Sequence, residues 1–229
     1  MYLPLNFIRS KWTLGLQPYI GVNQQFLKMH KDSKYEFSTD RFTSMSYQIS
    51  FYSRLKRSPK DIFSKWGHSM NLVYRHTPFG QKLNTQSFAS LYLFLPGIVR
   101  HHGLRLYGAY QETDVINYPY AGIISLARGY ANMSFSQVYS FKIDYALPII
   151  YPDIAIPSVL YLKRIHGRTF YDYMRGLHQD WDNYSSTGIE LYSDWHFLGL
   201  PAIFTLGGRM SYRLENSETV FEFLFGIGY

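Results

Sequence analysis

Residues 219–229 read TVFEFLFGIGY, and this stretch alternates strictly between two kinds of side chain. Successive side chains of a β-strand point to opposite sides of the sheet, so a strand here has one apolar face and one small, partly polar face. The apolar face carries Phe221, Phe223, Phe225, Ile227 and Tyr229. An apolar face toward lipid, a small or polar face toward a lumen and an interfacial aromatic residue are typical of transmembrane barrels. The stretch therefore predicts the final strand of an outer-membrane β-barrel, with Phe221, Phe223, Phe225 and Tyr229 as its C-terminal strand signal.

The composition favours the same class. Aromatic residues make up 19% of the chain and charged residues only 17%, and aromatics are enriched in strands and at membrane interfaces. The longest apolar run, residues 91–99, is interrupted by Pro96 and Gly97 and falls short of the roughly 20 residues that a spanning helix needs. The chain has no cysteine, which excludes disulfides, thiolate nucleophiles and cysteine-based metal sites.

The net charge of +7 raises the question of nucleic acid. However, Lys and Arg are scattered, and the basic pairs are limited to Lys56-Arg57 and Lys163-Arg164. A barrel with basic loops and a basic lumen explains the charge more simply than a nucleic-acid surface. We therefore expect no nucleic-acid partner.

Alternation with a period of two recurs along the chain and predicts about ten strands in an all-β, antiparallel transmembrane β-barrel. No helical period competes over a comparable length. The predicted strands cover residues 12–23, 46–55, 70–75, 86–95, 104–111, 140–147, 159–174, 189–196, 202–213 and 219–229. Their parity predicts that Trp12, Leu16, Phe51, Leu106, Phe141, Leu191, Phe204 and Phe225 point outward, and that Gln17, Arg105, Asp144, Glu190, Arg209 and Glu222 point inward.

Loop lengths predict the orientation, because bacterial barrels place the carboxyl terminus and the short turns on the periplasmic side. Outer loops are expected near residues 25–40, 77–85, 113–134, 175–186 and 215–218. Inner turns are expected near 9–10, 55–65, 96–101, 149–157 and 198–200, of which 55–65 is long for its side. The predicted location is the bacterial cell outer membrane, with membrane lipid as a partner.

The amino terminus has no secretory signal. Residues 1–10 resemble the tail of a strand that runs into a turn. We therefore interpret residues 1–229 as one barrel domain, the C-terminal portion of a longer precursor whose upstream strands and periplasmic region are missing.

The sharpest local motif is Arg128-Gly129-Tyr130, in the longest outer loop and five strands before the carboxyl end. Two further stretches follow it, KIDYALP at 142–148 and FYDYM at 170–174. Together they resemble the BamA-like surface-antigen superfamily, in which a (V/I)RG(F/Y) loop folds back into the barrel. The barrel portions that look most similar are those of Bacteroidetes-type bacteria. Two departures are Ala127, where the family often has Val or Ile, and Tyr173-Met174 in place of small residues.

The resemblance implies that Arg128 pairs inside the lumen with two acids, which here are Asp144 and Asp172. An arginine fork against a carboxylate is geometrically specific and would hold the loop in place. The resemblance also implies a barrel of sixteen-strand type that inserts or translocates client polypeptides, with no catalytic residue and no cofactor. Periplasmic or envelope proteins are further possible partners.

Alternatives stay open at this stage. Arg128-Gly129 also fits an ordinary polar turn, and both acids also fit plain lumen-facing positions. The eight histidines have no metal spacing, and no spacing selects a nucleophile among the Ser, His and Asp residues for a barrel hydrolase. The function could instead be that of a passive or substrate-specific pore, or of a membrane anchor for a periplasmic domain.

Overall fold

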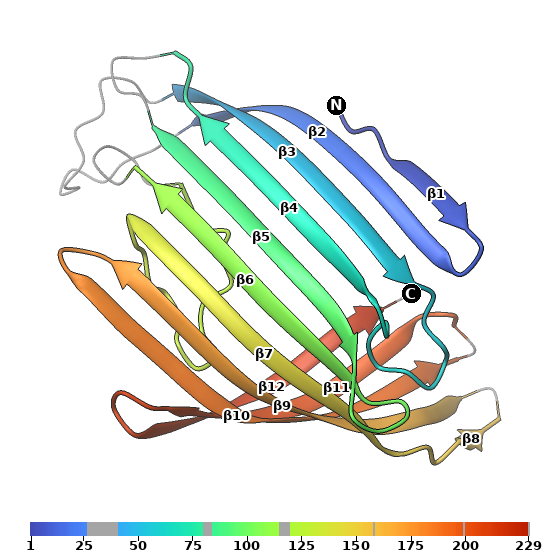
Figure 1. The fold of residues 1–229 in the computed structure, drawn as a ribbon. Helices are drawn as coiled ribbons and strands as arrows, with labels where there is room; N and C mark the ends of the chain where they lie inside the picture. The colour runs from blue at the N-terminus through green and yellow to red at the C-terminus, as the bar shows by residue number, and fades with distance from the viewer. Residues whose placement is uncertain (27–40, 80–83, 115–119, 158, 199, 229) are drawn as a thin grey trace.

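The computed structural model describes residues 1–26, 41–79, 84–114, 120–157, 159–198 and 200–228 (Figure 1). These residues form one antiparallel sheet of twelve strands and no helix, which confirms the predicted all-β, antiparallel class. The strands are β1 (Leu5–Arg9), β2 (Trp12–Phe26), β3 (Arg41–Leu55), β4 (Gly67–His76), β5 (Thr85–Pro96), β6 (Gly103–Thr113), β7 (Gln137–Ile150), β8 (Ile154–Ile156), β9 (Leu160–Leu177), β10 (Trp181–Phe197), β11 (Ile203–Arg213) and β12 (Glu218–Gly228). Within the described ranges, no helix is long and apolar enough to cross a membrane.

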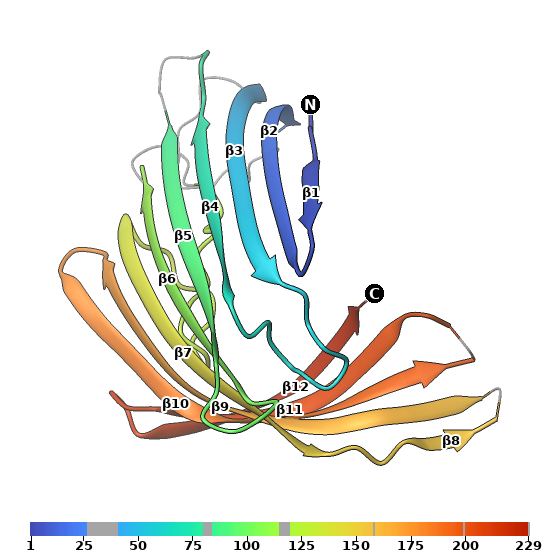
Figure 2. The ribbon, with the colours of Figure 1, turned by 45° about the vertical axis from the view of Figure 1, so that its right-hand side comes forward.

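The strands follow one another in chain order across the sheet, except that short β8 pairs only with β9 and β7 pairs directly with β9. The sheet is strongly curved, and its two edge strands face each other across a gap (Figure 2). Among the described residues, β1 pairs with β2 and β12 pairs with β11, and no pairing joins β1 to β12. The chain therefore shows a curved sheet rather than a demonstrated closed barrel.

The pairing register puts like residues on the same face of the sheet. One row on the concave face reads Gln17, Ser50, Asn71, Ser90, Ala109, Ser140 and Met174 from β2 to β9. The adjacent row on the convex face reads Leu16, Phe51, Met70, Leu91, Gly108, Phe141 and Tyr173. Polar and small residues thus line the inside of the curve, while apolar residues cover the outside.

Exposure follows this division. Phe221 and Phe223 of β12 are 75% and 76% exposed, whereas Asp144, Asp172 and Glu190 on the concave face are 2% exposed or less. The usual arrangement of a water-soluble protein, with apolar residues inside and acids outside, is reversed. The predicted outward and inward sets lie on the faces that their parity indicated.

Ten of the twelve strands overlap the ten predicted segments. The two additional ones are β1, which includes the strand tail expected at the amino terminus, and β8, which lies inside the segment 149–157 that was expected as a turn. The outer loop expected at 175–186 is much shorter, because β9 runs to Leu177 and β10 already begins at Trp181.

The strand predicted at 140–147 is longer in the structure, where β7 continues past Pro148 to Ile150. The register with β9 shifts between Pro148 and Ile150, which accommodates a proline that has no N–H for the ladder.

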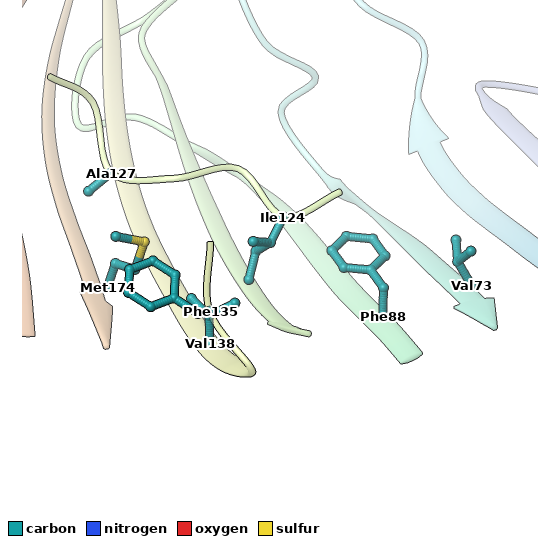
Figure 3. Packing of buried hydrophobic residues seen from close by; sticks show 7 residues of the cluster. All are labelled: Val73, Phe88, Ile124, Ala127, Phe135, Val138 and Met174. Carbon is teal, nitrogen blue, oxygen red and sulfur yellow. The ribbon is translucent and has the colours of Figure 1, made fainter. Parts of the chain in front are cut away.

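The long connection between β6 and β7 folds onto the concave face. Its residues Ile124, Ala127 and Phe135 pack against side chains from four strands (Figure 3). Those strand residues are Val73, Phe88, Val138 and Met174. The connection therefore covers part of the concave face and has a small apolar core of its own with the sheet, although residues 115–119 lie outside the described part.

Candidate functional site

Arg128 lies in the connection between β6 and β7, and its side chain reaches Asp172 in the middle of β9. Nε donates to Asp172 Oδ2 at 2.9 Å, and Nη2 donates to Oδ1 at 2.6 Å. The backbone N–H of Arg128 also donates to Oδ2, at 2.9 Å. One carboxylate therefore holds both the side chain and the main chain of the loop, and the planar fork gives the contact its direction.

Two further carboxylates share the same guanidinium. Nη1 donates to Glu190 Oε1 at 3.2 Å, and Nη2 lies 2.7 Å from Asp144 Oδ1. The second contact is an ion pair without aligned hydrogen-bond geometry, since Asp144 Oδ1 has no hydrogen-bond partner among the described residues. Arg128 is 9% exposed, and its Cζ lies 3.7 Å from the centre of the Phe170 ring. The five N–H donors of the Arg128 guanidinium are thus surrounded by three carboxylates and one aromatic ring.

Charge balance explains why a buried arginine is stable here. Burial alone lowers the pKa of the Arg128 guanidinium, but the hydrogen bonds with Asp172 and the fields of Asp144, Asp172 and Glu190 outweigh it and raise that pKa. Removing a single partner from such a group leaves a buried charge uncompensated, which costs about 3–5 kcal/mol. The stability of the buried Arg128 charge therefore depends on the carboxylates, and that of the carboxylates depends on Arg128.

Cations on the neighbouring strands hold the acids in turn. Arg105 of β6 donates to Asp144 Oδ2 through Nε and Nη2, at 2.9 and 2.7 Å. A cross-strand row of alternating charge runs through Glu190 from β9 to β12: Arg168, Glu190, Arg209 and Glu222. In that row Arg168 lies 3.0 Å and Arg209 2.7 Å from Glu190, and Arg209 also lies 3.0 Å from Glu222. Opposite charges at directly opposed positions stabilise a sheet.

Gly129 adopts φ +86°, in the left-handed region that favours glycine. A Cβ at this position would lie 3.3 Å from the Cβ of Ser211, so the backbone passes close to β11. Its carbonyl accepts hydrogen bonds from Nε of Arg213 at 2.8 Å and from Nη2 of the same residue. The glycine thus turns the loop so that its main chain meets an arginine of the sheet.

Tyr130, the next residue of the loop, contacts the turn between β11 and β12. Its hydroxyl donates to a Glu215 carboxylate oxygen and, at 3.4 Å, to the Ser185 carbonyl. Arg213 lies over the Tyr130 ring, with Cζ 5.0 Å from the ring centre. The hydrogen bond to Glu215 and burial both raise the pKa of the Tyr130 hydroxyl, burial being the larger cause. All three residues of the motif therefore contact strands or hairpins far along the chain.

The structure brings together Arg128, Gly129, Tyr130, Asp144 and Asp172, the five residues of the predicted motif. It also adds partners that the sequence did not predict, namely Glu190, Arg213 and Glu215. Parity placed Glu190 on the inner face, but its contact with Arg128 depends on strand register and loop path, which alternation does not reveal. In the C-terminal strand, Phe225 is 61% exposed and lies on the same exposed face as Phe221 and Phe223, while Tyr229 lies outside the described residues.

No protein-family model matches the chain, and comparison with curated proteins and with solved structures gives no significant match. The superfamily resemblance therefore stays a prediction that depends on the motif residues. In the described ranges, no three His, Asp or Glu side chains are placed to hold a metal ion. What the site can do chemically is hold a loop across the concave face through charged hydrogen bonds.

Proposed function

We propose that the chain is an outer-membrane β-barrel portion of BamA-like type that inserts or translocates polypeptides at the bacterial outer membrane. The observation that carries the proposal is the contact of Arg128 with Asp172, Asp144 and Glu190, which holds the β6–β7 connection against the concave face. A loop held in this way obstructs the lumen of a barrel. Obstruction favours a function at the sheet itself over free passage of solutes.

The exposed convex face supports the membrane part of the proposal. It carries large apolar side chains on nearly every strand, such as Ile49, Tyr139, Leu191 and Phe223. Exposed apolar area on this scale is rare on a monomeric soluble protein and suits contact with lipid. In hydrocarbon, an unpaired strand edge is costly and a client strand would relieve that cost, which gives a physical basis for insertion at the seam between terminal strands.

A pore and a membrane anchor are the alternatives. Both use the same apolar outer face, and a pore would use the polar concave face as its lining. They differ from the proposal in the role of the β6–β7 connection, because neither function requires Arg128 to hold this connection against the concave face.

The test is reconstitution of the protein in phosphatidylcholine vesicles, with a urea-denatured eight-strand outer-membrane barrel as the client. The proposal expects faster client folding, measured as heat-resistant mobility on a gel, and a several-fold slower reaction with Arg128→Gln. The control Arg175→Gln removes one exposed charge from the convex face of β9, opposite the face that carries Asp172. Steady ion conductance without any effect on client folding would replace the proposal with the pore.

A further inference from the structure

A second segment folds over the concave face. It lies at the end of the sheet opposite the β11–β12 turn that contacts Tyr130. It is the β3–β4 connection, residues 56–66, which turns back toward β9–β11 (Figure 2). Asp61 and Ile62 are 4% and 5% exposed, and the Asp61 carbonyl accepts a hydrogen bond from Nη1 of Arg164 at 3.4 Å. Tyr151 Oη donates to the Lys60 carbonyl at 2.8 Å. This long inner connection is therefore packed against the sheet.

Between this connection and the sheet lies a cavity of about 530 Å³. Its basic lining consists of five arginines and a histidine, Arg54, Arg57, Arg105, Arg164, His166 and Arg168, and none of the described residues that line it is an Asp or Glu. Four aromatic rings complete the walls, those of Phe63, Tyr92, Phe94 and Tyr192. A concave site with one sign of charge and low-dielectric walls concentrates ions of the opposite sign.

The acids behind the cavity do not balance these cations. Arg105, Arg164 and Arg168 are paired, respectively, with Asp144, Asp194 and Glu190. Two of those acids, Asp144 and Glu190, are shared with Arg128.

Arg54 and Arg57 have no carboxylate within ion-pair distance among the described residues. Arg54 instead lies over the Phe94 ring, with Cζ 4.6 Å from its centre, and Arg57 donates to the Ile62 carbonyl at 2.9 Å. Burial and, to a smaller extent, the charge of Arg164 lower the pKa of the Arg57 guanidinium, and the opposing fields of Asp194 and Asp61 are smaller. The cavity is thus lined by two arginines that have no ion-pair partner among the described residues.

Hydrogen bonding is also incomplete around the cavity. Nε of Arg54, Nε of Arg168 and Nδ1 of His166 are buried and have no hydrogen-bond partner in the part of the chain that the structure describes. Buried polar atoms without partners are uncommon and costly, and a group of them around one cavity calls for an explanation. An oxyanion in the cavity would bring acceptor oxygens to the two arginine N–H groups.

We propose that this cavity binds a soluble anion that carries one or two phosphate groups. Guanidinium forks match the oxygens of a phosphate, and several forks converging on one space suit a multiply charged anion better than a single carboxylate. The aromatic walls leave room for a ring or an apolar part attached to the phosphate. A lipid headgroup is disfavoured because the cavity opens on the polar concave face, whereas the apolar face lies on the other side of the sheet.

Isothermal titration of the purified full chain in detergent micelles with inorganic pyrophosphate, at constant ionic strength, tests the proposal. Saturable one-to-one binding is expected. The double variant Arg54→Gln/Arg57→Gln should bind pyrophosphate at least roughly tenfold more weakly than the native protein, because it loses charged hydrogen bonds. The control Arg9→Gln/Arg100→Gln removes two exposed charges at the same end of the sheet and should stay within about twofold of the native protein.

Arg54→Lys/Arg57→Lys keeps both charges and loses both forks, so an affinity between those of the native protein and the glutamine variant is expected. A wild-type protein without saturable pyrophosphate binding would overturn the proposal whether or not the variants fold. Equal losses in the cavity pair and the control pair would also overturn it, since the effect would then be net charge.

Titration with a soluble short-chain phosphatidylglycerol separates the two sources of phosphate. Tighter binding of this lipid than of pyrophosphate would overturn the assignment to a soluble anion in favour of a headgroup. The cavity site stands apart from the insertase proposal, because pyrophosphate binding and client folding are measured separately and either can fail alone.

Discussion

Asp172 binds Arg128 three times, twice through the guanidinium and once through the backbone N–H, at 2.6–2.9 Å. The acid comes from the middle of β9, and the arginine comes from a connection 44 positions earlier in the chain. Because the main chain of the loop is bound as well as the side chain, a change at Asp172 affects the path of the loop and not only its charge.

Replacing either partner should strongly destabilise the folded protein. Arg128→Ala and Asp172→Ala should each cost about 3–5 kcal/mol of unfolding free energy, because each leaves a buried charge without its partner. The double variant should cost less than the sum, with a coupling energy of at least about 1 kcal/mol. Arg128→Lys keeps the charge but loses the fork, and should lie between native protein and Arg128→Ala. Urea unfolding of the refolded protein measures all four, and strictly additive effects would contradict the contact.

Gly129 should tolerate no side chain. Gly129→Ala places a Cβ in the left-handed region and 3.3 Å from the Ser211 Cβ, so a cost of about 1–3 kcal/mol is expected. Gly122→Ala is the matched control in the same connection, since its nearest neighbour is an amide nitrogen 3.6 Å away. Its effect should stay within about 0.5 kcal/mol. Protease cleavage of the connection reports the loss of order, and equal cleavage of the two variants would argue against a specific turn at Gly129.

The contact of Glu215 with Tyr130 should depend on pH. Burial acts to raise the pKa of the Glu215 carboxyl, but hydrogen bonds from Tyr130 and Ser185 outweigh it and lower that pKa. A carboxyl with a depressed folded-state pKa contributes stability above its unfolded pKa, and this contribution disappears as the pH falls through the folded value. The melting temperature of the native protein should therefore exceed that of Glu215→Gln at neutral pH. The two should converge in acid, and a difference that is constant with pH would show that Glu215 acts without its charge.

A charged substitution on the convex face should destabilise the protein only when that face lies in a bilayer. Leu191 is 53% exposed on β10, and Leu191→Arg should cost about 2–4 kcal/mol in lipid vesicles if its position lies near mid-depth. Gln17→Arg, on the concave row of β2, should be milder because that face is polar. Refolding titrations into vesicles measure both. A negligible cost for Leu191→Arg in vesicles would count against contact of this face with lipid.

The sequence alone determined the two faces of the sheet and the approximate position of ten strands. Alternation is a local property, and residues 219–229 display it without reference to any other part of the chain. The same parity put Asp144 and Glu190 on the inner face. The pairing of Arg128 with Asp144 and Asp172 followed from a family resemblance in three short motifs, and the structure places these side chains in contact.

Tertiary structure decided which inward residues meet. Glu190 reaches Arg128, Arg213 reaches the Gly129 carbonyl, and the 56–66 connection brings Arg57 to the arginines of β3, β6 and β9, because register and loop path bring together positions far apart in the chain. Parity gives a residue its face but not its neighbour on the next strand. The length of the 56–66 connection was the one signal of its inward fold, and a length does not specify where a segment packs. The excess of positive charge in the cavity arises only when three separate strands and this connection are assembled.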